Sequence, residues 1–112
     1  MKPVVASYPK RGEVYVANLD KPRPAIILSV DQLNRHALDV CVVPVTSKQH
    51  VKFVLRVPLK KGEGGLDSDC WAKCDQVTTL EETFLSLKPL GSISLPRLHE
   101  IEEQVKVALG LI

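Results

Sequence analysis

Three separate stretches of the chain carry side chains that can act on a phosphate ester. Arg23 precedes an apolar run, Thr46 and Ser47 follow another, and Lys73 lies two residues before Asp75. A guanidinium can hold a phosphate through two parallel hydrogen bonds, and hydroxyl groups can donate to the phosphate oxygens. A carboxylate beside an ammonium offers a base and an acid. If strand ends bring these groups together, they can transfer protons around a phosphate.

The reaction that suits this set is transesterification within RNA. The ribose 2′-hydroxyl attacks the adjacent phosphate, so a base must take its proton, a cation must stabilise the phosphorane and an acid must protonate the departing 5′-oxygen. No metal is required. Spacing alone favours a plainer alternative, in which Lys73 and Asp75 form a surface ion pair and Thr46 and Ser47 cap a strand end.

Other common chemistries lack their motifs. The sequence has no Walker phosphate loop, no H-E-x-x-H, no G-x-S-x-G and no dinucleotide fingerprint. Cys70 and Cys74 have the spacing C-x-x-x-C without the further ligands of a zinc site, so we interpret them, with Cys41, as buried thiols and expect no metal and no other cofactor. The histidines are interpreted as solvated surface residues: His36, His50 and His99.

Length and composition indicate one domain. The chain has 112 residues, of which 45% are hydrophobic and 25% charged, enough to bury a core without disulfides. We interpret residues 1–112 as a single domain in which residues 1–10 are an N-terminal extension. No apolar run approaches the ~18–20 residues of a membrane-spanning helix, and the N-terminus lacks a signal-peptide core. We therefore expect a cytoplasmic protein with no membrane partner.

The charges are distributed unevenly along the chain. Residues 1–62 carry 11 Lys and Arg against 4 Asp and Glu, a net charge of +7, whereas residues 63–112 carry 4 against 9, a net charge of −5. The first half could face an anion, such as a nucleic acid or an acidic protein. Because an ordinary solvated surface can have the same charge, this asymmetry only slightly favours such a partner.

The elements that must position these residues are short strands followed by one helix. Alternation and β-branched content predict strands at residues 13–18, 25–30, 40–45, 53–57, 70–79 and 87–93. We expect the strand at 25–30 to be buried on both faces, with Arg23 and Pro24 at its mouth after a tight turn at 19–22. Pro44 indicates an edge or a bulge. Residues 31–37 could form one helical turn capped by Asp31, and the Gly-rich loop at 59–67 is the best candidate for a mobile segment.

The strand at 70–79 divides its side chains between two faces. Alternation places Cys70, Ala72 and Cys74 inward, and Trp71, Lys73 and Asp75 on the open side. The following helix, 95–109, has apolar residues at i, i+3 and i+4 spacing, Ser94 as N-cap and Gly110 as terminator. This order predicts an α+β fold, a small, partly closed antiparallel barrel with a C-terminal helix.

Five stretches in register resemble the MazF/PemK/Kid toxins of bacterial type II toxin–antitoxin systems. They are RGEVY at 11–15, RPAII at 23–27, VPVTS at 43–47, CDQV at 74–77 and ALGL at 108–111. The resemblance implies an SH3-like barrel of the CcdB/PemK type, a homodimer and an endoribonuclease, or mRNA interferase. Such an enzyme cuts single-stranded RNA without metal and leaves a 2′,3′-cyclic phosphate and a 5′-hydroxyl.

The resemblance also implies roles for particular residues. Arg23 matches the catalytic arginine, Thr46 the catalytic hydroxyl residue and Asp75 the proposed general base, and we expect Lys73 to act as the acid. The residues expected to contact RNA are Ser47, Lys48, Gln76 and Thr78. A cognate antitoxin would cover the same groove with an acidic tail, and the toxin–antitoxin complex would bind DNA.

This chain departs from the family pattern in two places. The first loop, usually long and Gly-rich, is a tight turn at 19–22, which predicts a more open groove. Lys73 and Thr78 stand where Kid-like members have arginine, and lysine cannot make the planar two-point phosphate contact. Two alternatives follow: an inactive homologue that only binds RNA or an antitoxin, and a CcdB-like gyrase poison acting through its C-terminal helix. Arg23 and Thr46 favour the nuclease, because gyrase poisoning needs neither.

Overall fold

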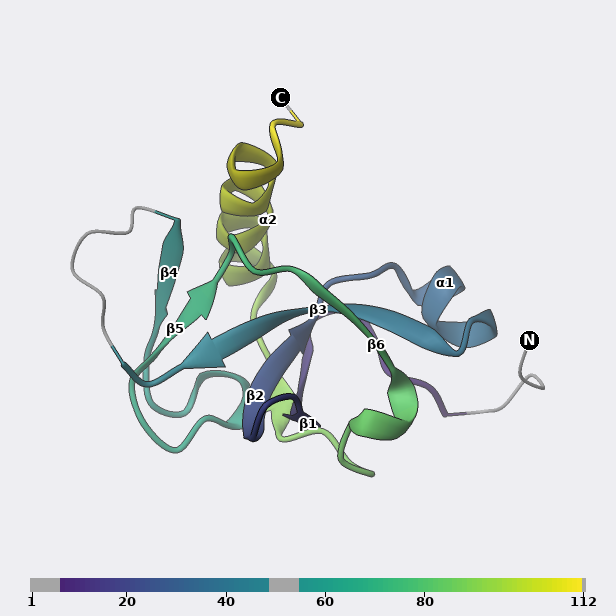
Figure 1. Ribbon diagram of the computed structural model, residues 1–112. Coiled ribbons are helices and arrows are strands. Elements are labelled where there is room, and N and C mark those ends of the chain that lie inside the picture. Colours follow the sequence, from purple (N-terminus) through teal and green to yellow (C-terminus); the bar gives the residue numbers. More distant parts are fainter. Residues whose placement is uncertain (1–6, 49–54, 112) are drawn as a thin grey trace.

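An antiparallel sheet curls around itself and carries one long helix against its concave side (Figure 1). This computed structural model describes residues 7–48 and 55–111. The elements are β1 (Glu13–Asn18), β2 (Pro22–Ile27), α1 (Asp31–His36), β3 (Asp39–Thr46), β4 (Arg56–Leu59), the 3-10 turn η1 (Glu63–Gly65), β5 (Cys70–Lys73), β6 (Thr78–Glu81), the 3-10 turn η2 (Glu82–Phe84), β7 (Gly91–Ser92) and α2 (Leu95–Leu109). The predicted fold class, an α+β barrel with a C-terminal helix, is confirmed.

Strand β3 is the centre of the sheet. The strand order is β4-β5-β3-β2-β1-β7, and β6 pairs with β3 as well. One edge of β3 pairs with β2, while its other edge pairs first with β6, where Val42 faces Thr78, and then with β5, where Val45 faces Ala72. The predicted single strand at 70–79 is therefore wrong, because the chain turns at 74–77 between β5 and β6.

Pro44 lies where the neighbouring strand is interrupted. The Leu28 N–H donates to the Cys41 carbonyl at 2.9 Å, so the odd-numbered residues of β3 direct their main-chain groups toward β2. Pro44 faces the opposite edge, where it has no N–H to offer. On that edge β5 ends at Lys73, and the following turn no longer pairs with β3. Pro44 thus lies at a gap in the pairing on one side of a central strand, and not at an edge strand as one of the two expectations had it.

Both faces of the sheet are apolar and covered. The face toward α2 carries Val14, Ile26 and Val43, and the helix packs Leu98 and Ile101 against them. The other face buries a second cluster: Tyr15, Ala17, Ala25, Ile27, Val40, Val42 and Leu80. Full burial of a side chain such as Ile26 or Ile101 stabilises the fold by roughly 1.5–3 kcal/mol. Of the run 25–30, predicted to be buried on both faces, Ala25, Ile26 and Ile27 are buried, whereas Val30 is 58% exposed.

Strand β2 begins and ends earlier than predicted. Pro22 already pairs with Asn18 of β1, so Arg23 and Pro24 lie inside the strand and not at its mouth. At the other end, the side-chain Nδ2 of Asn34 donates to the Ser29 carbonyl at 2.9 Å, so this carbonyl does not take part in strand pairing. The expected range of 25–30 is therefore wrong by three residues at each end, because pairing with β1 already begins at Pro22 and side-chain bonds of Ser29 and Asn34 follow Ile27.

Several other boundaries differ in detail. Asp31 is the first residue of α1 and not its cap, since its carboxylate accepts the Arg11 N–H at 2.7 Å and Val30 is the N-cap. Strand β4 begins at Arg56, and residues 53–54 of the predicted strand lie outside the described residues. The predicted strand at 87–93 is reduced to β7. Helix α2 has the predicted bounds; Ser94 Oγ accepts the Arg97 N–H at 3.3 Å, and Gly110 ends it at φ 69°.

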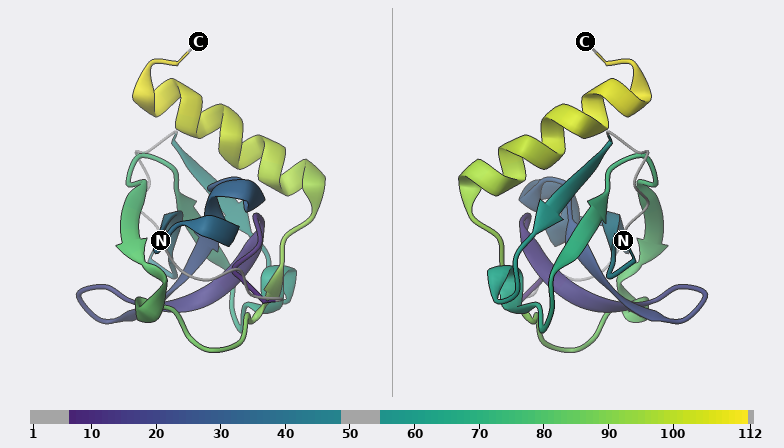
Figure 2. Two further views of the ribbon diagram at one scale, coloured as in Figure 1. Left: turned by 90° about the vertical axis from the view of Figure 1, so that its right-hand side faces the viewer. Right: turned by 90° about the vertical axis from the view of Figure 1, so that its left-hand side faces the viewer.

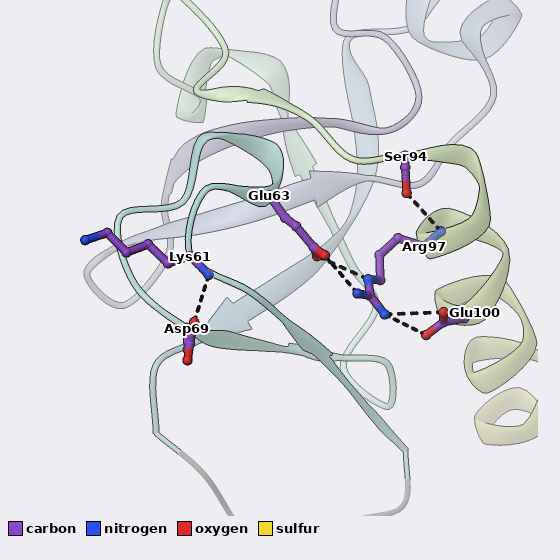
Figure 3. Close-up of polar contacts among 6 residues, drawn as sticks. All are labelled: Lys61, Glu63, Asp69, Ser94, Arg97 and Glu100. Atoms are coloured by element: carbon purple, nitrogen blue, oxygen red, sulfur yellow. Dashed lines mark hydrogen bonds and ion pairs between the residues drawn. The ribbon is translucent and has the colours of Figure 1, made fainter.

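The Gly-rich loop at 59–67, the predicted mobile segment, is bonded to α2 in the structure. Glu63 of η1 accepts two hydrogen bonds from Arg97, at 3.1 Å from Nε and 2.8 Å from Nη2, and Arg97 Nη1 reaches Glu100 at 3.0 Å (Figure 3). The Arg97 guanidinium lowers the pKa of the Glu63 carboxyl. Lys61 N–H also donates to Asp69 at 2.8 Å across the loop. The Arg97 bonds thus join the middle of the loop to α2, and the Lys61–Asp69 bond closes the loop on itself.

The cysteines and histidines match their expected roles only in part. Cys70 and Cys74 are buried free thiols, and burial raises the pKa of Cys74 to about 11. Cys41 is half-buried, not buried, because it faces Thr79 across the β3–β6 pair. The His99 side chain is 71% exposed, as predicted. His36 is only half-exposed, and His50 lies outside the described residues.

Substitution of two glycines in the same loop separates steric conflict from backbone strain. A Cβ at Gly65 would lie 2.1 Å from the Leu90 carbonyl oxygen, whereas a Cβ at Gly62 would meet nothing within 4 Å, and both residues have positive φ. We expect Gly65→Ala to lower the free energy of unfolding by about 3 kcal/mol or more, and Gly62→Ala by about 1 kcal/mol. Urea unfolding measures both; equal losses would contradict the close approach of the loop to Leu90.

Candidate functional site

A groove of about 430 Å³ lies at one end of the sheet, between β2, β3 and β5. It is lined by five of the predicted site residues: Arg23, Thr46, Ser47, Lys48 and Lys73. Lys21 and Arg56 add two more cations, and Asp67 is the carboxylate in the lining. We call this surface the cationic groove. The structure thus brings together residues that are far apart in the sequence, and their charge suits an anionic ligand.

The strand register explains why these residues meet. Ala25 of β2 faces Pro44 of β3, so two residues further along each strand Arg23 and Thr46 reach the same end of the sheet. On the other edge of β3, Thr46 faces Trp71 of β5, and Lys73 follows on the same strand. Three strands that are neighbours in the sheet, β2, β3 and β5, therefore place a guanidinium, a hydroxyl and an ammonium in the cationic groove.

Arg23 is held by a carboxylate that the sequence analysis missed. Both oxygens of Asp20 accept hydrogen bonds from Arg23, each at 3.0 Å, one from Nε and one from Nη2. This pairing lowers the pKa of Asp20 to about 2 and raises that of Arg23. The spacing of the pair, three residues across a tight turn, was the signal that could have revealed it.

Thr46 is a buried polar residue at the end of β3, with 8% of its surface exposed. Its Oγ1 accepts the Lys48 N–H at 3.1 Å. The plainer alternative, strand-end capping, is confirmed for Thr46. A hydroxyl that accepts one bond still has its own O–H to donate, so capping orients the group without consuming its proton.

Lys73 is a half-buried cation among other cations. Burial lowers the pKa of Lys73 most, and the positive charges of Arg56 and Arg23 lower it further. The negative charge of Asp75 opposes this shift. Among the described residues no ion pair joins Lys73 to Asp75, so the structure does not show the surface ion pair of the plainer alternative. An ammonium with a lowered pKa releases its proton more readily near neutral pH.

Three of the predicted site residues lie outside the lining of the cationic groove. Asp75 and Gln76 are exposed in the turn between β5 and β6, and Thr78 begins β6. The Gln76 N–H donates to the Lys73 carbonyl at 3.0 Å, and Thr78 Oγ1 donates to the Gln76 carbonyl at 2.9 Å. The expectation that Asp75 continues the strand beside Lys73 is wrong, because β5 ends at Lys73 and the chain turns there.

Arg56 is a further groove residue that sequence reasoning missed. It begins β4 directly opposite Lys73 of β5, and its side chain lines the cationic groove. No motif marks Arg56, and only the β4–β5 register brings it to the site. Arg56 therefore adds a planar guanidinium to the groove beside Lys73, whose ammonium group is not planar.

Two other cavities differ in character. One of about 690 Å³ lies over α1 and is lined mainly by apolar side chains, among them Val30, Leu33 and Leu38. The other, of about 420 Å³, lies between β1 and η2 beside Tyr15, whose pKa burial raises to about 12. Within residues 7–48 and 55–111, no three His, Cys, Asp or Glu side chains are grouped to hold a metal, and no helix is long and apolar enough to cross a membrane.

Fold and groove together define a class of small curled β-barrels that present cations and a buried hydroxyl at one end. Comparison with known proteins gives the family. Residues 10–109 match the model described as PemK-like, MazF-like toxin of type II toxin-antitoxin system, and the chain belongs to this family. It is 31% identical over 115 residues to Endoribonuclease MazF9 of Mycobacterium tuberculosis, an alignment that covers 91% of this chain and 97% of that relative.

Solved structures agree with this assignment. An endoribonuclease in complex with its cognate antitoxin from a mycobacterial species superposes with a TM-score of 0.81 at 28% identity, covering 93% of this chain and 97% of that one. MazF of a MazE–MazF complex from Deinococcus radiodurans, at 20% identity and a TM-score of 0.78, covers 95% and 100% and shares the fold. The resemblance inferred from the five motifs is confirmed, as is the prediction of a toxin-type endoribonuclease at the level of the family.

The charge environment of Lys73 can be measured directly. Competitive labelling with trace acetic anhydride across a pH series, read by mass spectrometry, should give Lys73 an apparent pKa below its ordinary 10.5, because burial and neighbouring cations favour the neutral amine. Arg56→Gln should move that pKa upward, with exposed Lys88 as the internal reference. An unchanged pKa in both proteins would contradict the proximity of Arg56 and Lys73.

Proposed function

We propose that this protein is the toxin of a type II toxin–antitoxin pair and cleaves single-stranded RNA in the cationic groove. The observation that carries the proposal is the convergence of Arg23, Thr46 and Lys73 at one end of the sheet. Membership of the MazF-like family supports the activity, and a curated relative is named an endoribonuclease. That kinship also favours the nuclease over a gyrase poison.

The scissile phosphate docks against the Arg23 guanidinium. The 2′-oxygen attacks phosphorus, the O2′–P bond forms and the P–O5′ bond breaks, giving a 2′,3′-cyclic phosphate and a 5′-hydroxyl. Arg23 and Lys73 stabilise the added negative charge of the phosphorane, and the Thr46 O–H donates to a non-bridging oxygen. None of these steps requires a group that the chain does not itself supply.

Two protons move in this reaction. Lys73 delivers one to the departing 5′-oxygen, and its lowered pKa makes it a stronger acid than an exposed lysine. Asp75 is retained as the candidate base for the 2′-hydroxyl, since its charge acts on Lys73 from the adjoining turn. Gln76 and Thr78 lie on that same turn and strand, where they can contact nucleotides beyond the scissile phosphate.

The partners follow from the same surface. We propose that a cognate antitoxin places an acidic segment on the cationic groove and competes with RNA for Arg23, Lys48 and Lys73. The mycobacterial relative was solved with its cognate antitoxin, which supports a partner of this kind. We further propose a homodimer, with the chain acting in the cytoplasm, where messenger RNA is present.

Arg23→Ala tests the proposal against a matched control. Purified protein is incubated with a long single-stranded RNA in EDTA, and the new ends are mapped, alongside Arg35→Ala, which removes an exposed arginine from α1 outside the groove. We expect discrete cuts bearing 5′-hydroxyls from the wild type and Arg35→Ala, and at least about 100-fold slower cleavage by Arg23→Ala. A fully active Arg23→Ala would refute the assignment. A folded wild type that binds RNA without cutting it would indicate the inactive homologue instead.

Thr46 can be tested by removing only its hydroxyl. Thr46→Val keeps the side-chain shape and Thr46→Ser keeps the O–H, so the pair separates chemistry from packing at this buried site. We expect kcat to fall about 10–100-fold for Thr46→Val and to stay within a few-fold of the wild type for Thr46→Ser. Single-turnover cleavage of a short RNA measures this. Equal rates for the two variants would show that the hydroxyl takes no part in the reaction.

A further inference from the structure

The β1–β2 hairpin joins Arg23 and Asp20 in an ion pair across a short turn. The turn at 19–21 is short, and Pro22 and Pro24 flank Arg23 on β2, so the backbone around it is restricted. Figure 2 shows the hairpin loop standing out from the body of the sheet. The Asp20 side chain is 70% exposed and the Arg23 side chain 25%, so the carboxylate reaches the guanidinium from the solvent side.

The geometry of the pair leaves one edge of the guanidinium for a ligand. Asp20 occupies Nε–H and one Nη2–H, each at 3.0 Å. A guanidinium has five N–H donors, so both protons of Nη1 and the second proton of Nη2 are not used by Asp20. Two of these N–H groups, one on each Nη, point in parallel along the outer edge, where they can donate to two phosphate oxygens.

The charge of the surrounding groove gives Asp20 a second effect. Lys21, Lys48, Arg56 and Lys73 share the lining with Arg23, and these cations repel its guanidinium. A carboxylate bonded to Arg23 offsets this repulsion and keeps the side chain in place. The same negative charge opposes the approach of a polyanion such as RNA.

We propose that Asp20 is a positioning residue for RNA cleavage: it fixes the Arg23 guanidinium so that its outer edge receives the scissile phosphate, at some cost in RNA affinity. The inference rests on the proposed nuclease function. Asp20 acts by orienting Arg23 and does not itself touch the reacting atoms. Loss of the carboxylate should therefore lower kcat and KM together, which a merely structural role would not do.

The test measures kcat and KM of Asp20 variants on a short single-stranded RNA with one cleavage site. We expect Asp20→Asn, which is neutral and has one acceptor oxygen, to lower kcat about tenfold and KM several-fold. Asp20→Glu keeps the charge and both oxygens and should recover most of kcat. Asp39→Asn removes an exposed carboxylate at the start of β3 that does not line the cationic groove, and should change kcat and KM by less than twofold.

A double variant shows whether Asp20 acts through Arg23. In an Arg23→Lys background, Asp20→Asn should lower kcat no further, because the group that it positions is gone. Circular dichroism melting of each variant confirms that the fold is retained. A wild-type or raised kcat in Asp20→Asn, or a full additional loss in the Arg23→Lys background, would overturn the inference. An active Arg23→Ala would instead overturn the proposed active site, so the two failures are distinguishable.

Discussion

Strand β3 is paired along both edges, and that pairing brings Arg23, Thr46 and Lys73 together in the groove. Its register with β2 carries Arg23 to the end of the sheet where β3 delivers Thr46, and its register with β5 brings Lys73 to the same place. A slip of one residue would turn Thr46 to the opposite face and exchange the valines of β3 between the two buried clusters on either side of the sheet. Burial of these valines on both faces of the sheet therefore fixes the geometry of the site.

The cationic groove gathers like charges that repel one another, and the rest of the molecule offsets this repulsion. Asp20 is bonded to Arg23, and burial with nearby cations shifts Lys73 toward its neutral form. Away from the groove, Arg97 binds Glu63 and Glu100 and joins the Gly-rich loop to α2. The scaffold thus uses balanced ion pairs, whereas the groove keeps an excess of positive charge that suits RNA or an acidic peptide.

Local signals predicted the elements that depend on local structure. The helix at 95–109 could be predicted because its period, its N-cap Ser94 and its terminator Gly110 are contained in one segment. The break at 74–77 could not, since the apolar alternation through Cys70, Ala72 and Cys74 continues while the chain changes its place along β3. Motifs identified Arg23 and Thr46, but Arg56 is brought to the groove only by cross-strand register.

The proposed reaction requires that the scissile phosphate of RNA binds at the ends of β2, β3 and β5. A crystal structure with a short RNA carrying a 2′-deoxyribose at the cleavage site, which cannot react, tests it most directly. We expect non-bridging phosphate oxygens within hydrogen-bond distance of the Arg23 guanidinium and the Thr46 hydroxyl. A phosphate bound elsewhere, with the cationic groove free of RNA, would contradict it.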